Sequence, residues 1–413
     1  MKIQEIEKEL FKDFSRNHIL KNFFQTKEYG ELMRHSEFSV MYIGGFKDET
    51  LVAASLILYK SIAPSIKYGY APRGFLINYY DTNLLKEFTK AVKDFFFKKG
   101  YAFIKINPEV TYSKVDFENK TKTINSKSEE LLNTLKEIGY DKLKDNLYFE
   151  SLLPKYTPVI NLNEFEKHLL DENLANELDD DENKGVYLIK GNENDIDTFY
   201  PFVESKNNKT SSYYKVFYEK FKDDNMIDLL LLNLDYNEYV IYLQKKYIIE
   251  QEKNDKINND FKQNPKDMDL FKLKMDSDKL LNDIQYDISL ANNKMQESVL
   301  KEIYGVALIT KYEGRITIII TGQKEEFRML DAKTFMYFKI IEEYKNAGYD
   351  YIDLYGITGD FTDKNPYKKL NEFKLKFKPS VFEYIGEFDL IVNKPLYQIL
   401  WSTNKIQKEF YGK

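Results

Sequence analysis

The chain has 413 residues, 43% of them hydrophobic and 15% aromatic, so it can fill the cores of two or three domains and is not a disordered protein. The absence of cysteine excludes disulfide bonds, thiolate nucleophiles and cysteine-ligated metals. A net charge of −6, from 61 basic and 67 acidic residues, argues against a protein that coats nucleic acid over its whole surface.

The sequence carries no signal for secretion or membrane insertion. No stretch approaches the roughly 20 apolar residues that span a bilayer, and residues 1–14 lack the apolar run of a signal peptide. We therefore expect a cytoplasmic protein. The histidines His18, His35 and His168 share no metal-ligand spacing and belong to no nucleophile motif, so the sequence predicts neither a zinc site nor a histidine-dependent triad.

Alternating apolar residues, turn residues and helical periodicity predict two units that follow the same order of elements. The first is an antiparallel sheet covered by helices, with a turn at Gly44-Gly45. Its strands are expected at 39–43, 51–59, 66–70 and 102–106, with a helix at 84–99. The second unit starts near residue 158, with strands expected at 186–190, 227–234, 307–312 and 316–321 and a last helix at 334–347.

One short phrase occurs in both units: a helix that ends in Gly-Tyr, followed by a strand. Gly100 and Gly348 each stand where a helix closes in the left-handed conformation, before the strand-like residues 101–106 and 349–354. The similarity covers about two dozen residues and indicates an internal duplication. The alternative is that a helix, a Gly-Tyr pair and a strand simply follow one another, as they often do in α/β proteins without any duplication. A weaker case of the same order occurs at 131–140.

Between the strands of the second unit, residues 237–301 have a different character. Leu281, Ile284, Ile288, Ala291 and Met295 follow a 3-4-3-4 spacing, and a similar seam precedes them at 236–247. The polar stretch 254–265 separates the two. We expect an antiparallel coiled-coil arm, the alternative being two helices packed flat on the sheet.

Three segments next to the repeated strands have residues that could carry chemistry. In the first, Arg73 lies between Pro72 and Gly74. Its guanidinium could bind a phosphate or carboxylate through two parallel hydrogen bonds, or Arg73 could be an ordinary loop arginine without such a role. In the second, 353–360, two glycines permit close approach of a ligand or form an ordinary turn. In the third, 370–377, a strand would point Lys374 and Lys376 either into a cleft or to solvent.

The chain resembles the Fem aminoacyltransferases, which build the cross-bridge of Gram-positive peptidoglycan. The resemblance rests on segments from both ends of the chain, namely 22–29, 70–74, 326–328, 348–360 and 373–389. It implies two tandem acetyltransferase-like (GNAT) domains with an inserted arm. We expect the domains at 1–152, with 380–413 packing back on it, and at 153–379, with the arm at 237–301.

The resemblance also implies a reaction and the residues that carry it. An amino acid passes from aminoacyl-tRNA to an amine of a UDP-linked or lipid-linked muropeptide, with no metal and no cofactor besides the tRNA donor. Lys374, beside Phe373, would stabilise the tetrahedral oxyanion, and Asp360 is our choice of general base. The residues expected to bind substrate are Arg34, Arg73, Lys209, Tyr213, Tyr355 and Gly356.

Several positions depart from the family pattern. Arg34 follows Met33 where relatives have a phosphate-binding lysine, and Lys209 stands where they have an arginine before a Tyr-Tyr pair. Asn107 replaces an aspartate before proline. The head of the second domain, 171–182, is acidic where relatives are basic, a run that would repel tRNA.

These departures keep two other hypotheses open. One is a non-catalytic protein that binds or assembles wall precursors, with the arm contacting a partner or a second copy. The other is an acyl-CoA-dependent GNAT-like N-acyltransferase, although no pyrophosphate-binding loop is visible. A lipid-linked acceptor would require docking at the inner face of the membrane.

Overall fold

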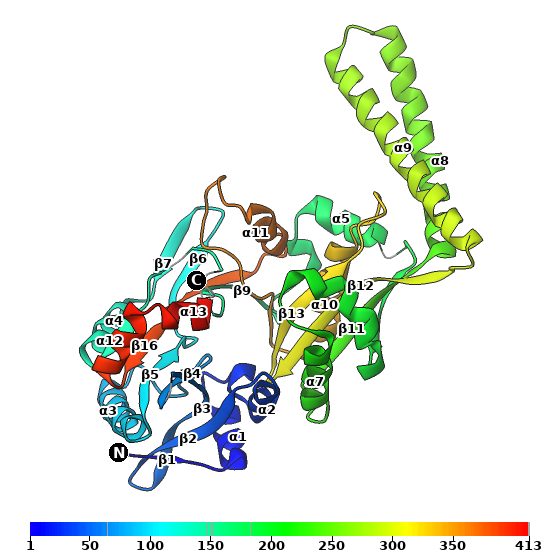
Figure 1. The fold of residues 1–413 in the computed structure, drawn as a ribbon. Helices are drawn as coiled ribbons and strands as arrows, with labels where there is room; N and C mark the ends of the chain where they lie inside the picture. The colour runs from blue at the N-terminus through cyan, green and yellow to red at the C-terminus, as the bar shows by residue number, and fades with distance from the viewer. Residues whose placement is uncertain (64, 146, 150–151, 182, 412–413) are drawn as a thin grey trace.

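The computed structural model describes residues 1–63, 65–145, 147–149, 152–181 and 183–411, and its strands form two sheets (Figure 1). The predicted α/β fold is confirmed. Glu182, the last residue of the acidic run, and residues 412–413 lie outside the described residues. The seven strands of the first sheet lie in the order β1 (Lys2–Glu5), β2 (Ser39–Lys47), β3 (Thr50–Ala63), β4 (Ile66–Ala71), β5 (Tyr101–Ile106), β16 (Phe388–Ile391) and β8 (Tyr140–Lys142). The nine strands of the second lie in the order β10 (Val186–Gly191), β11 (Ile227–Asp235), β12 (Lys301–Tyr312), β13 (Arg315–Gln323), β14 (Tyr351–Asp353), β9 (Tyr156–Asn161), β15 (Ser380–Tyr384), β6 (Thr111–Asp116) and β7 (Thr121–Ile124).

Helices cover both sheets. Apolar residues of α3 recur at helical spacing, and Phe88, Val92 and Phe96 are buried against the first sheet. The helices around the first sheet are α1 (Lys8–Asn17), α2 (Lys27–His35), α3 (Thr82–Lys98), α4 (Ser126–Glu137), α12 (Lys394–Ser402) and α13 (Lys405–Tyr411) (Figure 1). Those around the second are α5 (Glu172–Asp181), α6 (Ile196–Val203), α7 (Ser211–Lys222), α10 (Ala332–Asn346) and α11 (Lys368–Leu375).

Both copies of the repeated phrase form the same β–α–β unit. In the first sheet β4 and β5 pair in parallel across α3, and in the second β13 and β14 pair in parallel across α10. Each helix is followed by a glycine in the left-handed conformation, Gly100 with φ 80° and Gly348 with φ 81°. The helix–glycine–strand prediction is therefore confirmed at both places.

The two sheets exchange strands along the chain. β6 and β7 follow β5 in sequence but join the second sheet, where β6 pairs with β15. After β15 the chain returns to the first sheet, where β16 pairs with β5 and β8. The division of the chain near residue 152 stays a prediction.

The turn expected at Gly44-Gly45 was placed wrongly. Both glycines lie inside β2, and the chain reverses at Asp48 and Glu49, whose φ angles are 48° and 67°. A Cβ on Gly45 would lie 3.0 Å from the Phe88 ring of α3. Gly45 therefore permits close packing between sheet and helix, whereas a Cβ on Gly44 would meet Leu51 and Ile6.

The carboxyl-terminal segments also differ from the strand expectation. Residues 368–375 form the helix α11, on which Asn371 and Lys374 are both buried at a spacing of three. The sequence also favours one strand over 381–390, but Gly386, with φ 100°, divides this stretch into β15 and β16. These two strands then belong to different sheets.

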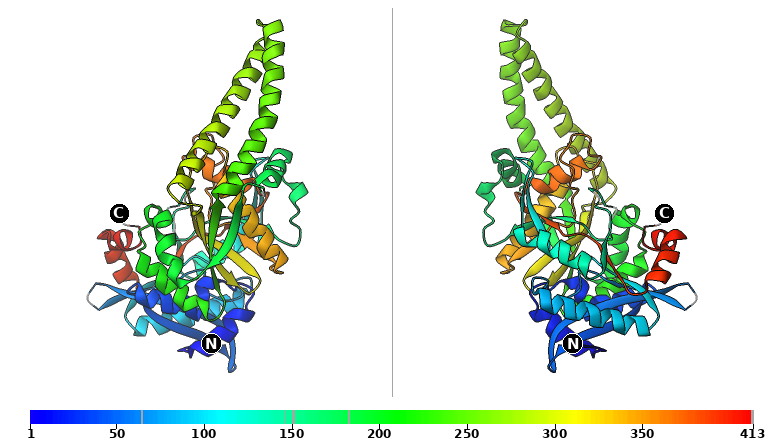
Figure 2. Two further views of the ribbon diagram at one scale, coloured as in Figure 1. Left: turned by 90° about the vertical axis from the view of Figure 1, so that its right-hand side faces the viewer. Right: turned by 90° about the vertical axis from the view of Figure 1, so that its left-hand side faces the viewer.

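The helices α8 (Tyr236–Gln263) and α9 (Met268–Gln296) form an antiparallel hairpin whose base joins the core of the second half and whose outer part projects away from both sheets, as Figures 1 and 2 show. Flat packing on the sheet is thereby excluded. The predicted break was too long, since α8 continues through 254–263 and the buried Asn254 side chain donates to Ser277 and Asp278 of α9. Supercoiling of the two helices stays a prediction.

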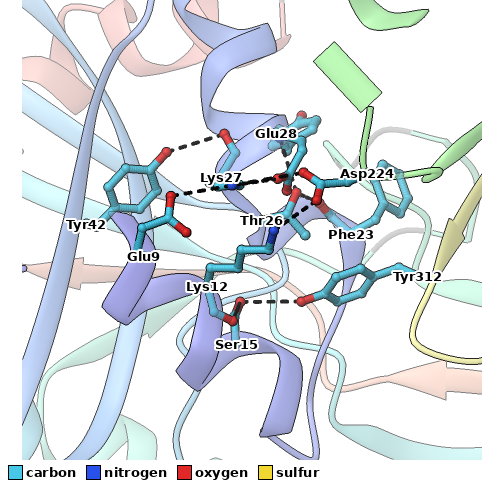
Figure 3. A network of polar contacts seen from close by, with 11 residues as sticks. Glu9, Lys12, Ser15, Phe23, Thr26, Lys27, Glu28, Tyr42, Asp224 and Tyr312 are labelled. Atoms are coloured by element: carbon cyan, nitrogen blue, oxygen red, sulfur yellow. Dashed lines mark hydrogen bonds and ion pairs between the residues drawn. The ribbon is translucent and has the colours of Figure 1, made fainter. Parts of the chain in front are cut away.

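Polar contacts join the two halves where α1 and α2 meet α7 and the turn between β12 and β13 (Figure 3). Lys12 pairs with Asp224 at 2.9 Å, and the Ser15 and Tyr312 hydroxyls lie 3.3 Å apart. Glu28 is buried beside them, lining a cavity of about 250 Å³. Burial raises the pKa of Glu28 to about 7, and the neighbouring Asp224 carboxylate adds to that rise.

Candidate functional site

Lys374 is a buried lysine held against a loop of the second half. Its side chain is 6% exposed, and its Nζ donates to the carbonyl oxygens of Tyr355, at 3.1 Å, and Gly356, at 2.9 Å. An ammonium has three protons to donate, so two are used here and one remains. Lys374, Tyr355 and Gly356, each expected at the site, are thus brought together.

Local hydrogen bonds fix the loop that receives Lys374. The Asp353 carboxylate accepts the Tyr355 backbone N–H at 2.7 Å, which supports Tyr355 in the left-handed region at φ 61°. Asn371 of α11 accepts the Thr358 N–H at 3.0 Å and donates to the Thr358 carbonyl. The loop and α11 therefore form one unit.

The surroundings of Lys374 shift its pKa in opposite directions. Burial lowers the pKa of Lys374 to about 7, and nearby Lys333 lowers it further, whereas the Asp353 carboxylate raises it. Burial also raises the pKa of Asp353, but the Arg315 guanidinium works to lower it. The charge of Lys374 near neutral pH therefore depends on the charge of Asp353.

Asp353 belongs to a cluster of charged side chains between the two sheets. Arg315 pairs with Asp353 at 2.6 Å and also with Glu109, which follows β5. The Tyr384 hydroxyl donates to Glu109 at 2.6 Å. Burial opposes ionisation of Glu109, but Arg315 and Arg73 outweigh it and lower the pKa of Glu109.

Arg73 lies on the other side of this cluster, almost fully buried. Its guanidinium donates to the Pro154 carbonyl at 2.9 Å and stacks over the Tyr384 ring, 4.9 Å from its centroid. Its backbone N–H donates to the side-chain oxygen of Asn107 at 2.9 Å. Phosphate binding by Arg73 stays a prediction.

Tyrosines from both halves meet next to Arg73. Burial raises the pKa of Tyr29, and the phenols of Tyr213, Tyr70 and Tyr355 add to that rise. Burial likewise raises the pKa of Tyr355 to about 12, which Arg73 partly offsets. Tyr29, Tyr213 and Tyr355 pack against one buried cluster that includes Phe23 and Phe217, so they form an aromatic patch across the seam. Tyr213 and Tyr355 were both expected to bind substrate.

Lys209, another cation expected to bind phosphate, lies on this patch. Its Nζ stands 4.5 Å from the centre of the Tyr213 ring. Burial lowers the pKa of Lys209, and so does the charge of Lys60 on β3. Arg34 instead lies at the exposed end of α2 and pairs with Glu31 at 3.7 Å.

Phe373 and Asp360 do not touch the Lys374 ammonium. Phe373 packs edge-on against Tyr337 at 4.8 Å, and the Lys333 Nζ lies 3.8 Å from its ring centre. The Asp360 carboxylate accepts the Tyr148 hydroxyl at 2.8 Å, and hydrogen bonds, chiefly from Thr362, lower the pKa of Asp360. The catalytic roles of both residues stay predictions.

The acidic run forms an amphipathic helix. Leu174 and Leu178 of α5 are buried in the core of the second half. Its acidic side chains are partly paired, Asp179 with Lys167 and Asp180 with Lys246. The repulsion expected from the run is reduced by these lysines.

The described residues contain no group of three or more His, Asp or Glu side chains arranged to hold a metal ion. Among them no helix combines the length and apolarity needed to cross a membrane.

The sequence did not identify Arg315, Glu109 or Lys60. Asp353 was visible only as part of the repeated phrase. Arg315 stands directly after Gly314, which turns with φ 81° between β12 and β13. Its buried partners come from segments 206 and 38 residues away, so local pattern gave no signal of the pairing.

The chain is similar to known proteins over nearly its whole length. The FemAB family model matches residues 6–405. The chain is 24% identical over 424 positions to aminoacyltransferase FemA of Staphylococcus epidermidis strain RP62A, covering 99% of this chain and 100% of the relative. It is 24% identical over 431 positions to aminoacyltransferase FemB of Staphylococcus epidermidis strain ATCC 12228, covering 99% of both.

Among solved structures, the crystal structure of FemX superposes with a TM-score of 0.72 at 17% identity, covering 97% of this chain and 100% of that one. At this identity the likeness concerns the fold, and it extends over both halves. The family resemblance expected from the sequence is confirmed. The chain belongs to the FemAB family.

Proposed function

We propose that the protein transfers an amino acid from aminoacyl-tRNA to the stem-peptide amine of a peptidoglycan precursor, as part of building the interpeptide bridge. Family membership over residues 6–405 supports an aminoacyltransferase of this pathway. The observation that carries the proposal is Lys374, a buried lysine whose Nζ is fixed by two backbone carbonyls of a loop in the second half.

This arrangement suits aminolysis of an ester. The incoming amine attacks the ester carbonyl carbon, and the carbonyl oxygen becomes an oxyanion. Two protons of the Lys374 ammonium are held by Tyr355 and Gly356, so the third is available to the oxyanion. When the tetrahedral intermediate collapses, the ester C–O bond breaks and the amide forms. The attacking amine loses one proton, and the ribose oxygen leaves as a hydroxyl that has gained one.

The acceptor is expected to bind along the seam. UDP-linked and lipid-linked precursors carry a diphosphate, and Lys60 and Lys209 bring positive charge from both halves to one place. The aromatic patch of Tyr29, Tyr213 and Tyr355 lies alongside. We assign the diphosphate to these lysines and the sugar–peptide part to the patch.

The test is transfer in a purified system. A pool of tRNA charged with radiolabelled amino acids is incubated with the protein and a UDP-linked muropeptide, and the product is identified by mass spectrometry. We expect the muropeptide to gain the mass of one aminoacyl residue, and no gain when the ester has been hydrolysed beforehand. Absence of transfer to both UDP-linked and lipid-linked acceptors with every charged tRNA, or equal transfer from acyl-CoA, would refute the proposal.

A further inference from the structure

Arg315 is a guanidinium shared between two carboxylates that come from different halves. One terminal nitrogen donates to Glu109, from the loop after β5, and the other donates to Asp353 of β14 at 2.6 Å. Glu109 also accepts hydrogen bonds from Tyr384 and Asn22. Asp353 receives a side-chain hydrogen bond from Arg315 alone among the described residues.

The contacts continue from Asp353 to Lys374. One Asp353 oxygen binds Arg315, and the other binds the Tyr355 N–H at 2.7 Å. The carbonyls of Tyr355 and the next residue hold the Lys374 Nζ. Arg315 is therefore linked to Lys374 through one carboxylate and one turn of backbone.

The charges along this path support each other. Burial and the neighbouring Glu109 carboxylate both raise the pKa of Asp353, and the Arg315 guanidinium that bridges the two carboxylates works against that rise. An ionised Asp353 in turn favours the ammonium form of Lys374 against burial and against Lys333 of α10. Without Arg315, both groups are driven towards their neutral forms.

We propose that Arg315 is a positioning residue for Lys374: through Asp353 it orders the Tyr355–Gly356 turn and keeps the lysine charged. The role in catalysis rests on the proposed transfer reaction, but the effect on Lys374 itself does not. Arginine suits this position because its two terminal guanidinium nitrogens bind the two carboxylates separately. The ammonium of a lysine is a single nitrogen and cannot reproduce this planar arrangement. Glu109 anchors the far side of the fork in the first half, so the site is complete only when the halves are docked.

The test measures the titration of Lys374 directly. The protein is labelled with ¹³Cε-lysine, and the Lys374 NMR signal is assigned by its absence from Lys374→Met. In the wild type we expect a midpoint near pH 7. Arg315→Met and Asp353→Asn should each move the midpoint at least one pH unit lower, and the double variant should move it no further. Arg16→Met, which removes a seam arginine paired with Glu313, serves as the matched control and should leave it in place.

Activity gives a second reading. In Arg315→Met and Asp353→Asn, kcat at pH 7 should fall about fivefold or more with KM for the acceptor little changed, because a midpoint one unit lower leaves about a tenth of the molecules, instead of half, with the charged lysine. If Arg315→Met does not fold, the inference is tested by Asp353→Asn alone, because that substitution keeps the shape of the side chain. Folded variants whose Lys374 midpoint equals that of the wild type would overturn the inference. A shifted midpoint in a protein that shows no transfer would uphold it and refute the proposed function instead.

Discussion

The buried Glu28 makes the stability of the protein depend on pH in a way that can be worked out from the structure. Its pKa rises from 4.5 to about 7 on folding, chiefly through burial. Between these pH values the unfolded chain has lost the proton that the folded chain keeps, so stability falls as pH rises. At about 1.4 kcal/mol per pKa unit, the loss is about 3 kcal/mol, complete above pH 7.

Glu28→Gln removes this dependence, because an amide does not titrate. Denaturant unfolding should give a variant about as stable as the wild type near pH 4.5 and about 3 kcal/mol more stable near pH 8. Asp224, whose pKa is lowered chiefly by its hydrogen bond from Lys12, contributes stability that is lost only as pH falls below 4 and lies outside this window. Taking the difference between variant and wild type cancels the other titrating groups.

The control is Glu31→Gln, on the same helix with a 39% exposed side chain, which should leave the pH dependence unchanged. The reasoning is refuted if Glu28→Gln and the wild type keep a constant difference in unfolding free energy from pH 4.5 to 8. It is also refuted if the wild type gains stability relative to the variant as pH rises.

Two further predictions concern the seam and the loop. Lys60→Met and Lys209→Met should each raise KM for a UDP-linked acceptor about tenfold with kcat unchanged, as expected for a charge-assisted contact of about 1.4 kcal/mol. Arg34→Met should raise KM less. Equal effects of all three substitutions would argue against assigning the diphosphate to Lys60 and Lys209. Gly359→Ala would place a Cβ 2.3 Å from the Tyr156 ring, so unfolding measurements should show a loss of about 1–3 kcal/mol. Gly348→Ala, in open space, should cost only the backbone strain of about 1 kcal/mol, and an equal cost at both positions would contradict this account.

The local sequence pattern was sufficient to predict an element where a residue type has one dominant structural role. Gly100 and Gly348 end helices in the left-handed conformation, and the strands after them follow as predicted. Gly44 and Gly45 led to a wrongly placed turn because their close contacts, Gly45 with Phe88 and Gly44 with Ile6, are made by folding and not by neighbours in sequence. Phe373 and Phe377 are four apart, a spacing that fits both a strand and a helix, so α11 was not recognised.

The sequence predicted the residues at the centre of the candidate site, around Lys374, but not the charged residues around them. Lys374, Tyr355 and Gly356 were found through the family resemblance, and the structure joins them. Arg315, Glu109 and Lys60 depend on pairings between the two sheets, and β6, β7 and β16 change sheets along the chain. Such pairings leave no trace in local periodicity.

The central claim is that the Lys374 ammonium stabilises the oxyanion of aminoacyl transfer. The direct measurement is single-turnover transfer from charged tRNA by Lys374→Met, compared with Lys369→Met, which removes an exposed lysine of the same helix. Loss of one preorganised oxyanion donor lowers the rate about 10²–10³-fold, so we expect that loss in Lys374→Met, with acceptor binding retained and Lys369→Met fully active. A Lys374→Met enzyme that transfers within threefold of the wild-type rate would contradict the account.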